Sequence, residues 1–208
     1  MHVNPNPGKA GDDWNYAFSC AKTPLVTLAH QDDIYEPTFT ERTLAYANNN
    51  PGKTILLFTD YYEIRDDKKV MSNRLLEIKR KMLAPLRTRI GSNSKFIRNR
   101  ILSFGDPICC PATTYVAASV GQNFFDTTFV NSCDYKTFVD LSKLEGAFVY
   151  IPEPLLGHRI YAGSATTKNL ADNIRKGEDA EILGEFWPKP FSKAINHFYA
   201  KSEDSNNL

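Results

Sequence analysis

The sequence predicts an α/β protein built around a strand–helix–strand unit. Residues 25–29 and 54–59 are short apolar runs, as is typical of buried strands. Residues 37–48 between them are predicted to form a helix, which ends at Asn48-Asn49-Asn50-Pro51-Gly52, a strong stop signal. Short links between a strand, a helix and a second strand favour a βαβ unit with parallel strands.

Length, composition and charge are those of a single globular domain. At 208 residues, 42% of them hydrophobic, the chain is long enough to bury a real core. The formal net charge of +1 implies no overall field that would draw the protein to nucleic acid or to a membrane. No apolar run reaches the length of about 18 residues that a transmembrane helix needs, and the N-terminus lacks the apolar region of a signal peptide. These features favour a cytoplasmic location.

The cysteines carry no metal or disulfide signature. Cys20, Cys109, Cys110 and Cys133 show no paired CxxC spacing. A zinc site or a disulfide framework is therefore not expected. Free, partly buried thiols in a reducing cytoplasm are the simplest interpretation.

Two further elements are predicted in the first half of the chain. Residues 12–21 form a short helix, which Asp12 or Asp13 would cap. Residues 61–67 lead out of the second strand into a variable excursion, and a third strand, bounded by Pro111, runs to about residue 116.

The second half continues with a helix and two strands. Residues 134–144 have helical spacing, with Asp134 at the N-cap position and Gly146 as the stop. Residues 147–151 form the next strand. Pro152-Glu153-Pro154 then turns the chain into an edge-type strand at residues 155–161.

The C-terminal part is predicted to be helical. A polar helix runs over residues 164–176, and residues 180–199 have helical periodicity that Pro188 and Pro190 interrupt. Residues 201–208 are expected to be disordered. We divide the chain into a main domain at residues 1–175 and a helical extension at residues 176–208.

One segment has a strong local charge bias. Residues 78–105 contain no acid but eight basic residues: Lys79, Arg80, Lys81, Arg87, Arg89, Lys95, Arg98 and Arg100. One interpretation is a solvated helix face balanced in space by carboxylates elsewhere; another is a cradle for an anionic acceptor or an anionic lipid surface. Nucleic-acid binding is disfavoured, because Phe96 is the only aromatic residue within residues 79–100 that could stack on a base.

The exit of the first strand carries two adjacent carboxylates, Asp32 and Asp33. Two anionic side chains at the end of a buried strand are costly unless they are neutralised. A divalent cation that carries phosphate oxygens is one suitable partner, and hard oxygen ligands suit Mg²⁺ or Mn²⁺. The alternative is a simple strand-to-helix turn, with Asp33 or Thr38 as the helix N-cap and Pro37 near the helix start.

The ordered set of motifs resembles the family 2 glycosyltransferases of the GT-A fold. Those enzymes carry an acidic DxD-type element after a strand, and further motifs follow it in a fixed order. The corresponding segments here are His30-Gln31-Asp32-Asp33-Ile34-Tyr35-Glu36-Pro37, Gly105-Asp106-Pro107-Ile108, Phe125-Asp126, Cys133-Asp134-Tyr135 and the run from Leu155 to Thr166. The resemblance spans residues 6 to 173 and implies a mixed, mainly parallel sheet flanked by helices.

The resemblance also implies a function and a set of site residues. It implies inverting, metal-dependent transfer of a sugar from a nucleotide-sugar to a glycan or lipid-linked acceptor, in polysaccharide or glycoconjugate assembly. Asp32, with Asp33 and His30 nearby, would bind the divalent cation, Mn²⁺ or Mg²⁺, which neutralises the leaving diphosphate. Asp134 would take the proton of the acceptor hydroxyl. It would lie on the order of 10 Å from Asp32, because a donor sugar must fit between the base and the metal.

The resemblance gives a role to two more residues, Asn15 and Arg159, and some of the proposed roles have a purely structural alternative. Asn15 stands at a family position for donor binding, and Arg159 would close over the diphosphate, where a guanidinium fork suits phosphate. A surface ion pair is the alternative for Arg159. A helix N-cap is the alternative for Asp134, and that role is compatible with catalysis.

The chain also departs from the family pattern. Only 31 residues precede Asp32, so that the nucleotide-binding half, roughly 90 residues, would be missing. His30, Cys133 and Tyr161 replace the family's Asp, Glu and His. We therefore expect weak or absent binding of nucleotide-sugars, and an exposed sheet edge that a second copy or a partner chain would cover.

Two classes of function follow from these observations. The first is a glycosyltransferase acting in the cytoplasm or peripherally at the inner face of the membrane. The second is a catalytically inactive, truncated relative that binds a glycan or a partner protein.

Overall fold

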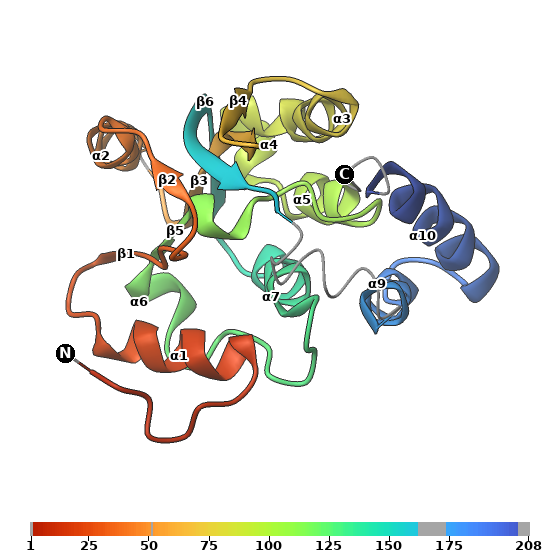
Figure 1. Ribbon diagram of the computed structural model, residues 1–208, viewed down its shortest axis with the longest axis horizontal. Coiled ribbons are helices and arrows are strands. Elements are labelled where there is room, and N and C mark those ends of the chain that lie inside the picture. The colour runs from red at the N-terminus through yellow and green to blue at the C-terminus, as the bar shows by residue number, and fades with distance from the viewer. Residues whose placement is uncertain (1, 51, 162–173, 204–208) are drawn as a thin grey trace.

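The chain forms a mixed, curled sheet flanked by helices, which confirms the α/β prediction (Figure 1). The computed structural model describes residues 2–50, 52–161 and 174–203, with side chains described to residue 196. The strands lie in the order β1-β5-β3-β6-β2, and β4 pairs with the far end of β3. Their bounds are β1 Leu25–Thr27, β2 Ile34–Tyr35, β3 Thr54–Arg65, β4 Lys68–Val70, β5 Thr113–Val116 and β6 Ala147–Arg159.

The prediction of a mainly parallel sheet is wrong. The long pair of β3 with β6 is parallel, from Thr54 opposite Ala147 to Ile64 opposite Arg159. The other described pairings are all antiparallel. β1 and β3 do run in the same direction, as the strand–helix–strand unit predicts. However, β5 is inserted between them in the opposite direction and forms the hydrogen bonds to both.

The helices of the described chain cover the two faces of this sheet. Their bounds are α1 Ala10–Cys20, α2 Phe39–Asn49, α3 Arg74–Leu83, α4 Arg89–Asn93, α5 Lys95–Leu102, α6 Ala117–Val120, α7 Cys133–Ser142, α9 Ile174–Gly184 and α10 Lys189–Glu203. Two short 3₁₀ helices, η1 Ala84–Arg87 and η2 Cys110–Ala112, complete the connections.

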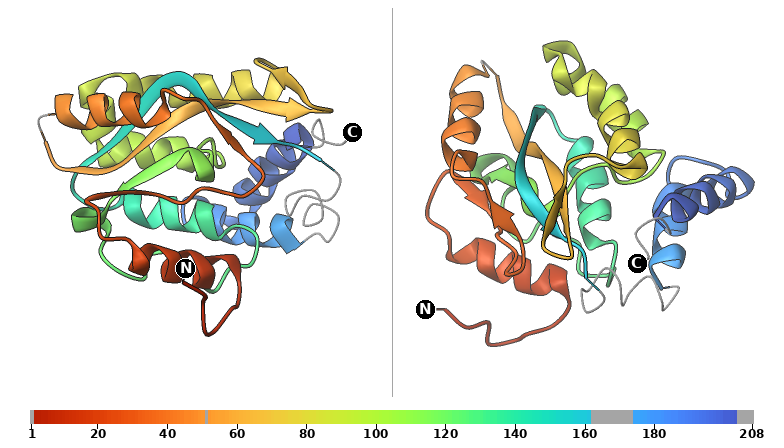
Figure 2. Two further views of the ribbon diagram at one scale, coloured as in Figure 1. Left: turned by 60° about the vertical axis from the view of Figure 1, so that its left-hand side comes forward. Right: turned by 45° about the horizontal axis from the view of Figure 1, so that its top comes forward.

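The alternation of side chains along β3 separates two hydrophobic layers. Leu57 packs with Val149 of β6 against Tyr46 of α2. Leu56 and its neighbours pack on the opposite face in the main core, with Phe138 of α7. Figure 2 (left) shows α7, and beyond it α1, on this side of the long strands.

The second strand is longer than predicted. β3 continues from Thr54 to Arg65, so that residues 61–65 belong to the sheet and not to an excursion. A two-residue turn then leads into β4. Asp66 and Asp67 both have positive φ, 48° and 58°, the conformation that tight hairpin turns require and that Asp adopts more readily than most residues.

β6 is one strand where the sequence predicts two. Pro152 and Pro154 do not turn the chain; the pairing with β3 instead shifts register on both sides of Asp60. This irregularity accommodates the missing N–H groups of the prolines. Residues 155–159 are also not at an edge, because β6 lies between β3 and β2.

The helix boundaries differ from the predictions by a few residues. α1 begins at Ala10, and Asp12 accepts a hydrogen bond from the backbone of the N-cap residue Lys9 instead of capping the helix itself. α7 begins at Cys133 with Ser132 at the N-cap position, so the N-cap prediction for Asp134 is wrong by two residues. Gly146, with a φ of 133°, does follow α7 as expected.

The C-terminal helices pack onto the main core. Ile182 and Leu183 of α9 are fully buried in the same cluster as β3 and α7. The Trp187 Nε1 group donates a hydrogen bond of 2.7 Å to the carbonyl of Ser103. α9 runs through residues 177–179, which lie between the two helical segments predicted from the sequence. α10 extends to Glu203, although disorder is predicted to begin at residue 201. Most of the predicted polar helix, residues 164–173, and the last five residues lie outside the described part of the chain.

Throughout the described ranges, every helix is too short or too polar to span a bilayer.

Gly157 should be the most size-sensitive position of β6. A Cβ atom there would lie 2.7 Å from the ring of Tyr62 and 2.8 Å from Ile64, both buried on β3. We expect Gly157→Ala to lower the free energy of unfolding by about 1–3 kcal/mol through overpacking. The matched control is Gly177→Ala in α9, where nothing lies within 4 Å; it should raise stability by up to about 1 kcal/mol. Urea unfolding of both variants checks the opposite signs, and equal effects would contradict the packing argument.

Candidate functional site

The loop between β1 and β2 is fastened to the end of β6. Asp33, whose side chain is 0% exposed, accepts hydrogen bonds at Oδ1 from the backbone N–H of Arg159 and from Nδ1 of His158, both at 3.0 Å. The Nε group of Arg159 donates to the carbonyl of Asp32 at 3.1 Å. The acidic pair is therefore held by two side chains more than 120 residues away in the sequence.

Asp33 is an ionised carboxylate in this arrangement. Burial pushes its pKa upward, but the hydrogen bond and charge of His158, together with the N–H of Arg159, outweigh burial and leave the pKa below its ordinary value. The turn interpretation offered Asp33 or Thr38 as the N-cap of the following helix; Asp33 is wrong and Thr38 is confirmed. The cap of α2 is Thr38, and it makes no side-chain capping hydrogen bond.

His30 belongs to the same loop and packs against α1. Its ring stacks on Trp14 of α1, with the centroids 5.5 Å apart. Burial lowers its pKa, and the charges of Asp33, Asp134 and Asp32 partly oppose that shift, whereas His158 adds to it. The charges of the loop carboxylates and of Asp134 thus act on the same half-buried imidazole. The separation of about 10 Å expected between Asp32 and Asp134 stays a prediction.

Two buried atoms of this cluster lack a hydrogen-bond partner among the described residues: Nε2 of His30 and Oδ2 of Asp33. A buried polar atom without a partner is costly, so each such atom calls for an explanation. A carboxylate oxygen and a neutral imidazole nitrogen are both ligand types for a divalent cation such as Mn²⁺. Within the described ranges, however, no three His, Cys, Asp or Glu side chains are grouped closely enough to hold a metal ion. The residues fit a cation only if oxygens of a bound ligand complete its coordination.

Asp134 occupies the first turn of α7. Its Oδ1 accepts a hydrogen bond of 2.8 Å from the N–H of Tyr135. A negative charge at this place interacts favourably with the helix dipole. The side chain is only half-buried, so the carboxylate is accessible. Asp134 can therefore be structurally satisfied in the helix and still meet a ligand.

Asp106 is a buried acid near Asp134 to which sequence reasoning gave no role. Its side chain is 5% exposed and accepts from the N–H of Ile108 at 3.0 Å. Burial, and next the charge of Asp134, raise its pKa well above the ordinary value. The signal available in the sequence was its place in the Gly105-Asp106-Pro107-Ile108 segment, which was used only for the resemblance.

The cysteines are free, partly buried thiols, as predicted. All four are free, and Cys109, Cys110 and Cys133 are buried. Burial raises the pKa of each of these three thiols, and the charge of Asp134 adds to the effect at Cys110 and Cys133. Protonated thiols of this kind are poor nucleophiles.

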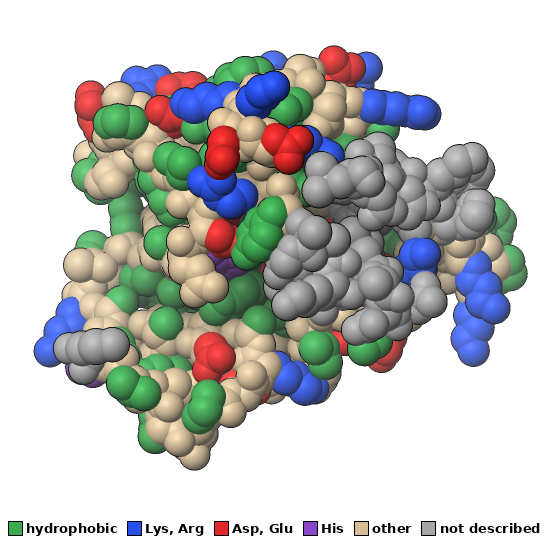
Figure 3. Space-filling view, in the orientation of Figure 1, with side chains coloured by type: hydrophobic (Ala, Val, Ile, Leu, Met, Phe, Trp, Pro, Cys, Tyr) green, Lys and Arg blue, Asp and Glu red, His purple; other side chains and the backbone are tan. Residues whose placement is uncertain are grey.

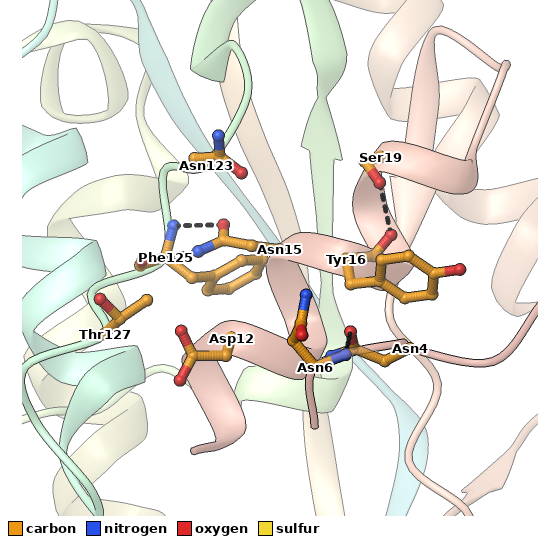
Figure 4. Close-up of a pocket in the computed structure, with 9 residues that line it drawn as sticks. All are labelled: Asn4, Asn6, Asp12, Asn15, Tyr16, Ser19, Asn123, Phe125 and Thr127. Atoms are coloured by element: carbon orange, nitrogen blue, oxygen red, sulfur yellow. Dashed lines mark hydrogen bonds between the residues drawn. The ribbon is translucent and has the colours of Figure 1, made fainter. Parts of the chain in front are cut away.

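Asn15 has a structural role. Its amide donates to the carbonyl of Phe125 at 2.9 Å and accepts from the N–H of the same residue at 3.0 Å (Figure 4). It thereby joins α1 to the loop before α7. A polar cavity of about 430 Å³ lies beside it, lined by Asn4, Asn6 and Asn123 among others. Donor binding by Asn15 stays a prediction.

Arg159 and the basic segment have partners within the chain. Arg159 forms an ion pair of 2.7 Å with the exposed Asp67, the alternative predicted for it. Arg80 pairs with Asp60 at 2.7 Å and Lys95 with Glu145 at 2.6 Å, whereas Arg98 is buried. These contacts fit a helix face balanced in space by carboxylates. On the face shown in Figure 3, acidic, basic and histidine side chains lie side by side near the middle.

Comparison with known proteins adds no family assignment. No protein-family model matches the sequence, and no curated protein matches it either. The relation to glycosyltransferases rests on the motif order alone.

Proposed function

We propose that the chain carries the metal- and diphosphate-binding part of an inverting glycosyltransferase site that uses a nucleotide-sugar. The supporting observation is that the loop carboxylates Asp32 and Asp33, and Asp134 of α7, all act electrostatically on the same half-buried imidazole of His30, whose Nε2 atom has no hydrogen-bond partner among the described residues. Asp134 lies about 100 positions along the chain from the two loop carboxylates.

Each side chain has a role in this proposal. Asp32, with the free atoms of Asp33 and His30, would hold Mn²⁺ or Mg²⁺. The cation, when bound, neutralises the charge of the leaving diphosphate. Asp134 would accept the proton of the acceptor hydroxyl as the sugar inverts. Arg159 would exchange its exposed ion pair with Asp67 for the diphosphate, because an exposed pair contributes little to stability.

The proposed acceptor is a glycan or a lipid-linked saccharide. The lipid-linked form would be met by the protein acting from the cytoplasm at the inner face of a membrane. No role for nucleic acid is proposed, since the basic side chains Arg80, Lys95 and Arg98 have partners within the chain or are buried in it.

A second candidate function is a binding module without activity. It is supported by the position of β1 at one end of the sheet, where one side of the strand carries no partner strand within the described residues. A cavity of about 320 Å³ adjoins β1 and is lined mainly by Leu25 and Thr27 of β1, Phe39 and Leu44 of α2, and Thr114. A second copy or a partner chain that adds a strand to this edge would also cover the cavity.

Titration calorimetry of the chain with UDP-, GDP- and dTDP-sugars, with and without Mn²⁺, tests the proposal. We expect binding that depends on Mn²⁺ and is weaker than micromolar, because the proposed site residues would bind the diphosphate and not the base and ribose. Asp32→Asn should weaken it further.

The outcomes separate the two candidates. The absence of Mn²⁺-dependent binding for every donor, at millimolar concentrations, would refute the transferase proposal and favour the binding module. Binding that is equally strong without Mn²⁺, or unchanged by Asp32→Asn, would contradict the roles given to the loop.

A further inference from the structure

A carboxylate of α9 binds the backbone that leads into α7. Glu178 accepts three hydrogen bonds from consecutive N–H groups: Val130 at 2.7 Å through Oε1, and Asn131 at 2.8 Å and Ser132 at 2.9 Å through Oε2. These N–H groups precede the helix and have no intrahelical acceptor. The carboxylate of Glu178 thus accepts hydrogen bonds from all three of these N–H groups before α7.

The next residue of α9 strengthens the same attachment. Asp179, 4% exposed, accepts a hydrogen bond of 2.7 Å from the hydroxyl of Ser132. Ser132 is itself the N-cap residue of α7 and makes no side-chain capping bond within its own helix. Its hydroxyl is used to join α7 to α9 instead.

The hydrogen bonds from α9 end at Ser132, two residues before the candidate base Asp134. Asp134 is the second residue of α7, directly after the loop that Glu178 holds. The direction of its side chain depends on the backbone of residues 130–133, because the first turn of a helix inherits its orientation from the N-cap. Hydrogen bonds to a carboxylate are stronger than neutral ones, so this backbone is held firmly.

Residues of both α9 and α7 next to this contact are buried, so the contact belongs to the core. Ile182 and Leu183, one turn along α9, are 0% exposed, and Cys133 at the start of α7 is 1% exposed. The loop therefore cannot follow a displaced α9 without disturbing the packing beneath Asp134.

We propose that Glu178 and Asp179 are positioning residues that fix the start of α7 and thereby aim Asp134. The helical segment after residue 173 is then a component of the candidate site and not an appendage. The inference rests on the proposed function as far as the role of Asp134 is concerned, whereas the control of the loop by α9 is independent of it.

The test compares Glu178→Gln and Asp179→Asn with Glu181→Gln, an exposed glutamate of the same helix. In ¹H–¹⁵N NMR spectra of the full chain, the N–H resonances of residues 130–132 should move upfield in Glu178→Gln, and those of Asp134 and Tyr135 should move with them. Exchange of the three amides with solvent should become about tenfold faster or more, since glutamine offers one uncharged acceptor oxygen in place of the two charged oxygens that hold them. Glu181→Gln should change none of these.

A purely structural role would give a different result. If Glu178→Gln lowers the free energy of unfolding but leaves the resonances of residues 130–135 in place, Glu178 only adds stability and the proposal is overturned. Asp179→Asn, which keeps an acceptor oxygen for Ser132, should give the smaller resonance shifts; larger shifts than in Glu178→Gln would also contradict the proposal.

An activity measurement separates this proposal from the proposed function. Where the wild-type chain releases nucleoside diphosphate from a donor, Glu178→Gln should lower kcat about tenfold or more with little change in donor affinity. A wild-type chain that neither binds nor cleaves any donor refutes the transferase function, and the NMR shifts then decide by themselves whether α9 controls the loop.

Discussion

Replacing Arg98 with methionine should lower the free energy of unfolding by about 3–5 kcal/mol. Arg98 is 1% exposed, and its guanidinium donates to four backbone carbonyls, those of Ser92, Ser142, Leu144 and Gly146. These carbonyls lie at or just beyond the C-terminal ends of α4 and α7, where helices leave acceptors unpaired. Methionine fills a similar volume but removes this donor from all four carbonyls, of which those of Ser92 and Ser142 are buried; among the described residues, only Ser142 keeps another side-chain donor, the amide of Asn99 at 3.5 Å.

Lysine should not rescue the variant, because one ammonium group cannot reproduce the planar fork that reaches four acceptors. Arg89→Met is the matched control: Arg89 belongs to the same basic segment but is exposed, and its loss should change stability by no more than about 0.5 kcal/mol. Urea unfolding followed by circular dichroism measures all three variants. A loss below about 1 kcal/mol for Arg98→Met would mean that the four hydrogen bonds add little.

Arg98 also shows that the charge pattern of a segment does not decide which of its side chains are buried. Along the sequence it is one of eight basic residues in a segment without acids, and nothing local distinguishes it from Arg89. Three of its acceptors lie 44–48 residues away, at the end of a different helix. Its burial is decided by that tertiary contact, which local periodicity does not contain.

The strands were predicted best where local signals agree with the fold. The apolar run that forms the first half of β3 is buried, whereas β1 is buried only at Val26 and half-buried at Leu25 and Thr27; α2 follows in the chain as expected. β6 was divided in error, because Pro152 and Pro154 are strong local turn signals. A register shift opposite Asp60 overrides them, and such a shift depends on the partner strand.

Local sequence signals likewise indicate only part of the candidate site. Asp32, Asp33 and Asp134 stand out by type and position, and a resemblance of motifs was enough to select them. The residues that hold them were not selected: His158 binds Asp33 across 125 positions, and Glu178 binds the approach to Asp134 across 46 to 48. Supporting contacts of this kind are set by the packing of distant elements and leave little trace in a single sequence.

Asp134→Asn should lower the turnover of a donor by about 100- to 10,000-fold, the usual contribution of a general base. The amide cannot accept a proton, but its Oδ1 can still accept the hydrogen bond from the N–H of Tyr135. The fold should therefore persist. Loss of a charge in the first turn of α7 should cost no more than about 1 kcal/mol. Metal-dependent release of nucleoside diphosphate from a nucleotide-sugar is the measurement, with calorimetry of the same donor beside it.

Asp32→Asn is the contrasting variant, since it should weaken Mn²⁺-dependent donor binding as well as turnover. Asp134→Asn should leave donor affinity nearly intact, because its carboxylate is assigned to the acceptor side of the cleft. This difference separates a base from a metal ligand even where both variants are inactive. Near-normal turnover in Asp134→Asn would remove Asp134 from the mechanism and leave it a first-turn residue of α7. Equal losses of donor affinity in the two variants would place both carboxylates on the diphosphate side, against the division of roles proposed for them.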